Sequence, residues 1–283
     1  MHHRLNRRVM LGAAAALALP ALPVRGQSGG QGGGTPISIS LAPFLSPNAL
    51  LAAFRPLREH LERTLRAPVE MLSARDFRSQ AESVRAGQQD AAMMPAHVAR
   101  LAMIDWKHEL LAATLDALRV QVLVRQDSPV QRPAELRGQR IGMGDALSLT
   151  ATVGRQWLRE QGLGDGVEVV TMPSVNSALH ALDRRELAMA IAGESQLAAL
   201  PPETPRSYRM LASIGAIPGP MYVAQPGLPE ARREALRAAL LSFAPDPARP
   251  TTASNARLHL PDAALLARLD PLAAIARQVL ASG

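Results

Sequence analysis

The sequence predicts an α/β protein of two lobes, each built on a mainly parallel sheet flanked by helices. Strand-like and helix-like segments alternate from Ile37 onward, as they do where right-handed helical crossovers join parallel strands. Two extended stretches, near 110–125 and 208–224, separate one run of alternating elements from another. About 250 residues follow the N-terminal leader and 47% of the chain is apolar, which suits two compact lobes or one large domain.

Residues 1–26 have the pattern of an export signal. Three arginines precede an uncharged run at 9–24, which is shorter than the roughly 20 apolar residues needed to span a bilayer. We expect cleavage near Gly26, followed by a flexible Gly-rich linker at 27–35. The paired arginines partly match a Tat signal, and a Sec signal fits the same residues.

The composition favours a soluble periplasmic protein over a nucleic-acid binder. The formal charge is +7, but the leader holds four arginines and no acidic residue, so the remaining chain carries only +3. Aromatic residues make up 3% of the chain and no dense basic run occurs, which argues against stacking on bases. The chain has no cysteine, and we therefore expect no disulfide, no thiolate metal site and no lipid anchor.

The first lobe is expected to comprise residues 36–119 and 216–283. Its first helix begins with Ser46 as N-cap and a proline at the first helical position, and Pro56 should kink or split that helix. Apolar periodicity and turn residues place its strands at 37–41, 69–72, 91–94, 110–114 and 220–224, and its helices at 46–65, 77–86, 97–104, 229–243 and 262–281.

The second lobe is expected to comprise residues 120–215. The segments near 117–121 and 214–219 would connect the lobes and act as a hinge. A cleft between such lobes faces the carboxyl ends of the strands and the starts of the helices that follow them. The same periodicity places strands at 120–125, 140–143, 167–171, 187–192 and 208–214, and helices at 150–161 and 175–184.

The clearest site signal in the sequence is an oxyanion site at the start of the 150–161 helix. A short strand runs into a Gly/Asp turn, and three hydroxyl residues follow at alternate positions: Ser148, Thr150 and Thr152. The first turn of a helix has unpaired N–H groups and a partial positive charge, and the hydroxyls add further donors. In the alternative interpretation, one hydroxyl is simply the helix N-cap.

Two loops of the first lobe would face the same cleft. One carries Pro43, Phe44 and Ser46, and the other follows Pro95 and carries His97. A second helix start opposite the first suits an anion, although Ser46 is also a common N-cap. His97 and the neighbouring Arg100 could supply positive charge, or they could be solvated or capping residues. Glu194 and Tyr222 are further candidates.

Four segments of the chain resemble the solute-binding proteins of ABC importers for phosphonate, phosphite and related oxyanions, a branch of the type 2 periplasmic binding proteins. The resemblance covers about Ile37 to Phe243. The segments are Ala42-Pro43-Phe44; Arg85-Ala86-Gly87-Gln88-Gln89-Asp90 through Met94-Pro95; Glu135-Leu136-Arg137-Gly138-Gln139-Arg140-Ile141 through Gly144-Asp145; and Ile217-Pro218-Gly219-Pro220. Their order and spacing imply two lobes with two hinge crossovers.

The resemblance also implies which residues would bind the ligand. The family's Ser-Thr-Ser-Gly-like run corresponds to Ser148-Leu149-Thr150-Ala151, so leucine and alanine replace a hydroxyl residue and a glycine. Phe44 stands where the family often has a tyrosine, and Asn176 where it often has a histidine. Glu194 is the carboxylate nearest to the family's acidic position. These departures predict a more apolar pocket, in which an organic anion with an apolar part fits as well as phosphonate.

We therefore expect a monomeric periplasmic protein that closes over a small anion and presents it to the membrane permease of an ABC transporter. A sensor that signals to a membrane histidine kinase is the alternative among binding proteins, and an enzyme on the same bilobed scaffold is the alternative from another class. The histidines show no spacing typical of metal ligands, and no acid/base pair is visible, so we expect no metal, no cofactor and no catalytic residues.

Overall fold

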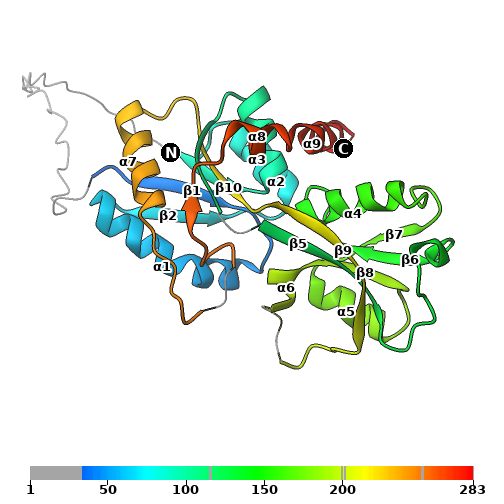
Figure 1. Ribbon diagram of the computed structural model, residues 1–283. Helices are drawn as coiled ribbons and strands as arrows, with labels where there is room; N and C mark the ends of the chain where they lie inside the picture. The colour runs from blue at the N-terminus through cyan, green and yellow to red at the C-terminus, as the bar shows by residue number, and fades with distance from the viewer. Residues whose placement is uncertain (1–33, 115–116, 199, 201, 250–251, 283) are drawn as a thin grey trace, which may run out of the picture. The chain divides into compact units, whose positions relative to one another are not determined.

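The computed structural model describes residues 34–114, 117–198, 200, 202–249 and 252–282, and Figure 1 shows their α/β arrangement. The expected export signal and almost all of the expected linker lie outside these residues. Two separate sheets are present in the described part of the chain, and helices flank both of them. None of the described helices has the length and apolar character needed to cross a membrane.

The first sheet has six strands in the order β11-β4-β10-β3-β1-β2. β2, β1 and β3 are parallel neighbours, whereas β10 and β11 run antiparallel to the strands beside them. Its strands are β1 (Ile37–Leu41), β2 (Val69–Ser73), β3 (Ala91–Met94), β4 (Glu109–Thr114), β10 (Met221–Ala224) and β11 (Leu258–His259).

The second sheet has five strands in the order β7-β6-β8-β5-β9. β7, β6 and β8 are parallel, and β5 pairs antiparallel with both β8 and β9. Its strands are β5 (Ala117–Arg125), β6 (Arg140–Met143), β7 (Glu168–Thr171), β8 (Met189–Gly193) and β9 (Tyr208–Pro218). In both sheets most strands run in the same direction, as the sequence predicts.

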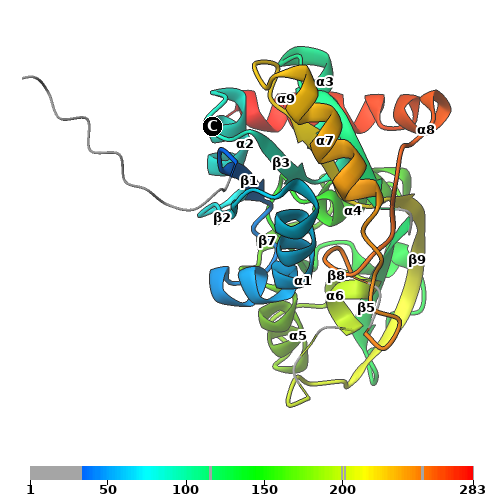
Figure 2. The same ribbon diagram turned by 90° about the vertical axis from the view of Figure 1, so that its left-hand side faces the viewer.

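Helices cover both faces of the six-stranded sheet. α1 and α7 lie side by side over one face (Figures 1 and 2), and their apolar residues pack with those of the strands into one buried cluster. α2, α3 and α9 cover the opposite face. The helices of the chain are α1 (Pro47–Leu65), α2 (Phe77–Arg85), α3 (Ala96–Asp105), α4 (Leu149–Glu160), α5 (Val175–Asp183), α6 (Glu194–Ala198), α7 (Glu230–Leu241), α8 (Ala263–Ala267) and α9 (Asp270–Ala281), with a 3-10 turn η1 (Pro133–Leu136).

The five-stranded sheet is also covered on both faces. α4 packs on one face through buried side chains that include Trp157 and Leu158, and α5 and α6 pack on the other. Alternate residues of β5 divide between these faces, because successive strand side chains point to opposite sides. Val122 contributes to the α4 side, and Leu123 to the α5 side.

The chain passes between the sheets twice, and the two passages run next to each other. β5 follows β4, and β9 leads into β10. β5 and β9 pair along their whole length, from Ala117 opposite Pro218 to Arg125 opposite Tyr208. β4 and β10 continue the same antiparallel pairing in the other sheet. A two-stranded ribbon therefore connects the sheets at the place where the sequence predicts a hinge.

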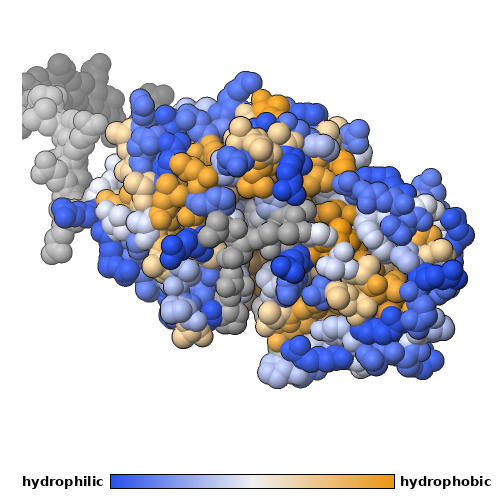
Figure 3. Space-filling model, viewed as in Figure 1, coloured by the Kyte–Doolittle hydropathy of each residue, from blue (hydrophilic) through white to orange (hydrophobic). Residues whose placement is uncertain are grey.

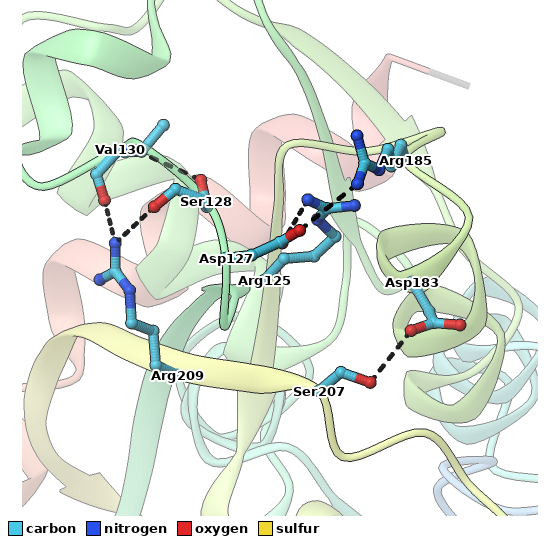
Figure 4. Close-up of polar contacts among 8 residues, drawn as sticks. All are labelled: Arg125, Asp127, Ser128, Val130, Asp183, Arg185, Ser207 and Arg209. Atoms are coloured by element: carbon cyan, nitrogen blue, oxygen red, sulfur yellow. Dashed lines mark hydrogen bonds and ion pairs between the residues drawn. The ribbon is translucent and has the colours of Figure 1, made fainter.

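A network of arginine contacts holds the outer end of this ribbon (Figure 4). Arg125 pairs with Asp127 in the turn after β5, and Arg185 reaches the same carboxylate at 3.4 Å. Arg209 on β9 donates to the carbonyl oxygens of Ser128 and Val130. These contacts tie the 127–130 turn to the strand beside it.

Two expectations about single elements need correction. The C-terminal helix expected over 262–281 is two helices, α8 and α9, because Pro271 lacks an N–H group and its ring would clash with the carbonyl of Ala267 in a continuous helix. Pro56 does not split α1, which runs unbroken from Pro47 to Leu65. The carbonyl that loses its partner there belongs to Ala52, an exposed residue at which water can replace the missing donor.

Candidate ligand-binding site

A cavity of about 680 Å³ lies between the loops that follow the strands of the two sheets. Residues after β1, β3, β6 and β8 line it, so it lies at the carboxyl ends of parallel strands, where α/β proteins bind ligands. Figure 3 shows the molecule hollowed between the regions that carry the sheets. The lining residues are Ala42, Phe44, Leu45, Ala53, Phe77, Pro95, Thr114, Arg119, Ser148, Leu149, Thr150, Glu194, Ser195, Gln196, Ala198, Gly219, Pro220, Arg249, Thr252, Ala253, Ser254 and Ala256.

The start of α4 is the main group of hydrogen-bond donors in the cavity wall. Ser148 is the N-cap of this helix, and its Oγ accepts from the backbone N–H of Ala151 at 3.2 Å. The same Oγ lies 3.3 Å from Oγ1 of Thr150. The amides of Leu149 and Thr150 fall in the first turn, where a helix offers no acceptor. Together with the partial positive charge of the helix start, they can bind an oxyanion.

A turn before α4 sets the position of its first residues. The carboxylate of Asp145 accepts from the backbone N–H of Leu147 at 2.8 Å, and its carbonyl oxygen accepts from that of Ser148 at 2.9 Å. An aspartate after a strand commonly forms such a turn, because its side chain reaches the backbone two residues on. The strand, the turn and the N-cap thus point the start of α4 at the cavity.

Thr152 and His97 form a buried pair behind this helix start. Nε2 of His97 on α3 lies 3.1 Å from Oγ1 of Thr152 on α4, and both side chains are excluded from solvent. Burial lowers the pKa of His97 from 6.5 to about 3, so the ring is neutral at pH 7. The pair joins helices that belong to different sheets, and it lies outside the cavity lining.

Three charged residues line the cavity, and their charges sum to a single positive charge. Nε of Arg119 lies 3.9 Å from Oε2 of Glu194, with more than half of each side chain exposed. Arg249 is exposed and has no carboxylate within 4 Å among the described residues. The cavity therefore offers one unpaired cation to an anionic ligand.

An apolar surface faces these polar groups. It consists of six residues from the loops and helices that follow strands of the six-stranded sheet: Ala42, Phe44, Leu45, Ala53, Phe77 and Pro95. The ring of Phe44 packs edge-on against Phe54 with centroids 6.2 Å apart, which fixes it beside the cavity. This wall agrees with the apolar pocket expected from the sequence.

The structure brings five of the residues proposed from the sequence into one cavity: Phe44, Pro95, Ser148, Thr150 and Glu194. Ala151, Thr152 and His97 are buried behind the start of α4.

The other residues considered from the sequence lie elsewhere. Ser46 is the exposed N-cap of α1, Pro43 lies beside the lining residues Ala42 and Phe44, and Asn176 on α5 accepts a hydrogen bond from Thr204. Arg100 pairs with Asp270 at 2.7 Å, and Tyr222 is buried in β10, where burial raises the pKa of its phenol.

The sequence did not point to the residues that the cavity receives from the C-terminal segment. Arg249, Thr252 and Ser254 lie far from α4 in the sequence, and only the return of the chain to the six-stranded sheet places them at the cavity. Ser195 and Gln196 could have been predicted from the sequence as lining residues, because they lie just after the expected strand that became β8. Among the described residues, no group of three His, Asp or Glu side chains is arranged to hold a metal ion.

Comparison with known proteins gives a family match and several structural relatives. Residues 39–264 match the family model of phosphonate ABC-transporter periplasmic substrate-binding proteins. No curated protein matches the chain.

Three solved structures are similar to this chain in fold and distant from it in sequence. A binding-protein component of an ABC phosphonate transporter from Pseudomonas aeruginosa superposes with a TM-score of 0.71 at 15% identity, over 87% of this chain and 89% of that one. A Prochlorococcus marinus protein in complex with methylphosphonate gives 0.72 at 11% identity, over 86% and 98%. A Xanthomonas citri protein bound to chloride ion gives 0.71 at 17% identity, over 88% and 99%. At these identities the likeness concerns the fold, and it confirms the two-lobed architecture.

Proposed function

This chain belongs to the phosphonate family of periplasmic substrate-binding proteins of ABC transporters, and on that premise we propose that it binds a small oxyanion at the start of α4 and delivers it to a membrane permease. The observation that carries the proposal is the position of Ser148, Thr150 and the first-turn amides of α4 in the wall of the cavity. Hydrogen bonds from such groups to an anion are charge-assisted, and they strengthen where water is excluded.

Closure of the cavity would couple binding to transport. The proposed lobes are residues 36–119 with 216–283, and residues 120–215. They would move about the ribbon in which β5 and β9 pair. The ligand must interact more favourably with the closed form than with the open form for this movement to follow binding. A monomer that closes in this way presents a changed surface to its permease, and the same change would suit a sensor kinase.

A binding role fits the site better than catalysis. The pair that most resembles a nucleophile and a base is Thr152 with His97, but both side chains are buried and outside the cavity lining. Geometry of this kind holds two helices together and gives no access to a substrate. We therefore propose a binding protein and not an enzyme, exported to the periplasm by its N-terminal signal.

The proposal is tested by removing the hydroxyl donors at the start of α4. Ser148→Ala with Thr150→Ala should weaken binding of the best ligand in a calorimetric screen of phosphate, phosphite, alkylphosphonates, alkylsulfonates and carboxylates by about tenfold or more. Removing the N-cap should also cost about 1 kcal/mol of stability.

Ser174→Ala is the matched control, because Ser174 is the N-cap of α5, accepts from Ser177 N–H at 3.0 Å and does not line the cavity. It should cost similar stability and leave binding intact. Small-angle scattering of the wild type should show compaction with the best ligand. Unchanged affinity in the double variant, or no binding in the whole screen, would refute the proposal.

A further inference from the structure

The segment between α7 and β11 forms part of the cavity wall. Arg249, Thr252 and Ser254 of this segment line the cavity together with Ala253 and Ala256. The segment reaches the cavity because β11 pairs with β4, with Leu258 opposite Thr114. It supplies polar groups on the side of the six-stranded sheet, whereas α4 supplies them from the side of the five-stranded sheet.

A buried asparagine is bonded to the backbone of this segment at two described residues, Asp246 and Arg249. Oδ1 of Asn255 accepts from the backbone N–H of Asp246 at 2.8 Å, and its Nδ2 donates to the carbonyl oxygens of Asp246 and Arg249 at 3.0 and 3.2 Å. The residue is only 4% exposed. Buried polar side chains that bond several backbone groups hold those groups in place, so the backbone of Arg249 is tied to Asn255.

The polar groups of this wall are available to a ligand. Oγ1 of Thr252 lies 3.1 Å from Oγ of Ser254, and this pair leaves further donor and acceptor capacity. Thr114, which also lines the cavity, has a buried hydroxyl with no hydrogen-bond partner among the described residues. Arg249 has no ion-pair partner there, whereas Arg119 already faces Glu194 at 3.9 Å. The uncompensated cation of the cavity is therefore Arg249.

We propose that Arg249, with Thr252 and Ser254, forms a second subsite that binds a carboxylate at the far end of the ligand. The inference rests on the proposed function, in which α4 holds the oxyanion. The ligand would then be an organic dianion, with an oxyanion at one end, a carboxylate at the other and an apolar part against Phe44 and Phe77. A cavity of about 680 Å³ lies in the range that holds whole organic ligands, and it has room for more than one inorganic anion.

Three phosphonates that differ only at the far end test the subsite. They are 3-phosphonopropionate, propylphosphonate and 2-aminoethylphosphonate, which end in a carboxylate, a methyl group and an ammonium group. By calorimetry at one fixed salt concentration, the wild type should bind the carboxylate-ended compound about three- to tenfold more tightly than the methyl-ended one. Arg249→Gln should abolish this preference, because it should weaken the binding of 3-phosphonopropionate more than the binding of propylphosphonate.

Arg257→Gln is the matched control, since Arg257 is an exposed arginine of the same segment that does not line the cavity. It should keep the preference for the carboxylate. The subsite is refuted if Arg249→Gln keeps that preference, or if the methyl- or ammonium-ended compound binds most tightly to the wild type, and the proposed function then still stands. If the wild type binds none of the three and no other oxyanion, the proposed function fails and the subsite fails with it.

Discussion

His97 gives this protein a dependence of stability on pH that can be predicted from one contact. The ring on α3 is fully buried, with Nε2 at 3.1 Å from Oγ1 of Thr152 on α4. Oγ1 of Thr152 donates its proton to the carbonyl of Ser148 at 3.0 Å, so we assign Nε2 of His97 as the donor to Thr152. Nδ1 is buried and has no partner among the described residues. A second proton on this ring would therefore meet neither water nor an acceptor.

The sign and size of the effect follow from the pKa. Burial lowers the pKa of His97 from 6.5 to about 3, so the unfolded chain takes up a proton at a pH where the folded chain does not. The contribution to stability is fully present above pH 6.5 and is lost as the pH falls from 6.5 towards 3. At about 1.4 kcal/mol per pH unit, the loss from His97 between pH 7 and pH 5 is about 2 kcal/mol.

Urea unfolding at pH 7 and pH 5 measures this loss. His97→Gln keeps an N–H donor without a group that titrates in this range, and the variant should lose about 2 kcal/mol less than the wild type between the two pH values. His60→Gln is the control, because His60 lies on α1, bonded to the carbonyl of Ala239, and takes no part in the α3–α4 contact. Equal losses in wild type and His97→Gln, or NMR signals that show a protonated His97 ring in the folded protein at pH 5, would refute the reasoning.

Two further predictions concern the packing of helices. An added Cβ at Gly154 would lie 2.5 Å from Cδ1 of Ile191, so Gly154→Ala should lower the free energy of unfolding by about 1–3 kcal/mol. Ile191→Val deletes that Cδ1 and should restore part of the loss in the double variant; urea unfolding that shows no rescue would contradict the clash. Arg277 holds the pKa of Asp105 below its usual range through two 2.7 Å hydrogen bonds, so Arg277→Gln should raise that pKa in an NMR titration. An unmoved Asp105 titration would show that the pair does not form.

The order of strands and helices could be predicted from the sequence because apolar periodicity and helix caps are local signals. Ser46-Pro47 marks a helix start, and the run from Ile141 to Thr152 contains a strand end and a helix start. The structure confirms both helices. The two crossings were also predictable, since 110–125 and 208–224 are extended segments between runs of alternating elements. The structure shows that they pair with each other, which no single segment reveals.

The features of the site that could not be predicted from the sequence depend on contacts between residues far apart in the chain. His97 follows a strand end as a ligand residue would, but the α3–α4 packing buries it against Thr152, and no local pattern shows this. Arg249 lies in a segment of prolines and small residues that has no periodicity. It reaches the cavity only through the pairing of β11 with β4. Local chemistry thus predicted lining residues that follow the parallel strands, and tertiary structure adds those of the C-terminal segment.

The contacts around His97 also restrict how the cavity can open. Residues of α3, α4 and α9 belong to one continuous buried cluster, so separating α4 from α3 would expose apolar surface at about 25 cal/mol per Å² and break the buried hydrogen bond. The exposed lining residues Arg119, Glu194 and Arg249 mark the open side of the cavity. Opening should therefore keep the α3–α4 contact while the lobes turn about the β5–β9 ribbon, and it should widen the cavity on that exposed side.

The absence of cysteine makes this movement measurable with pairs of spin labels. Labels at Leu45→Cys and Ser195→Cys, on opposite sides of the cavity, should approach each other when the best oxyanion of the screen is added. Labels at Ile104→Cys on α3 and Gln156→Cys on α4 should keep their distance, because the cluster between these helices stays closed. If the second pair moves as far as the first, the sheets separate as whole bodies, and the His97 contact is then broken in each cycle of binding and release.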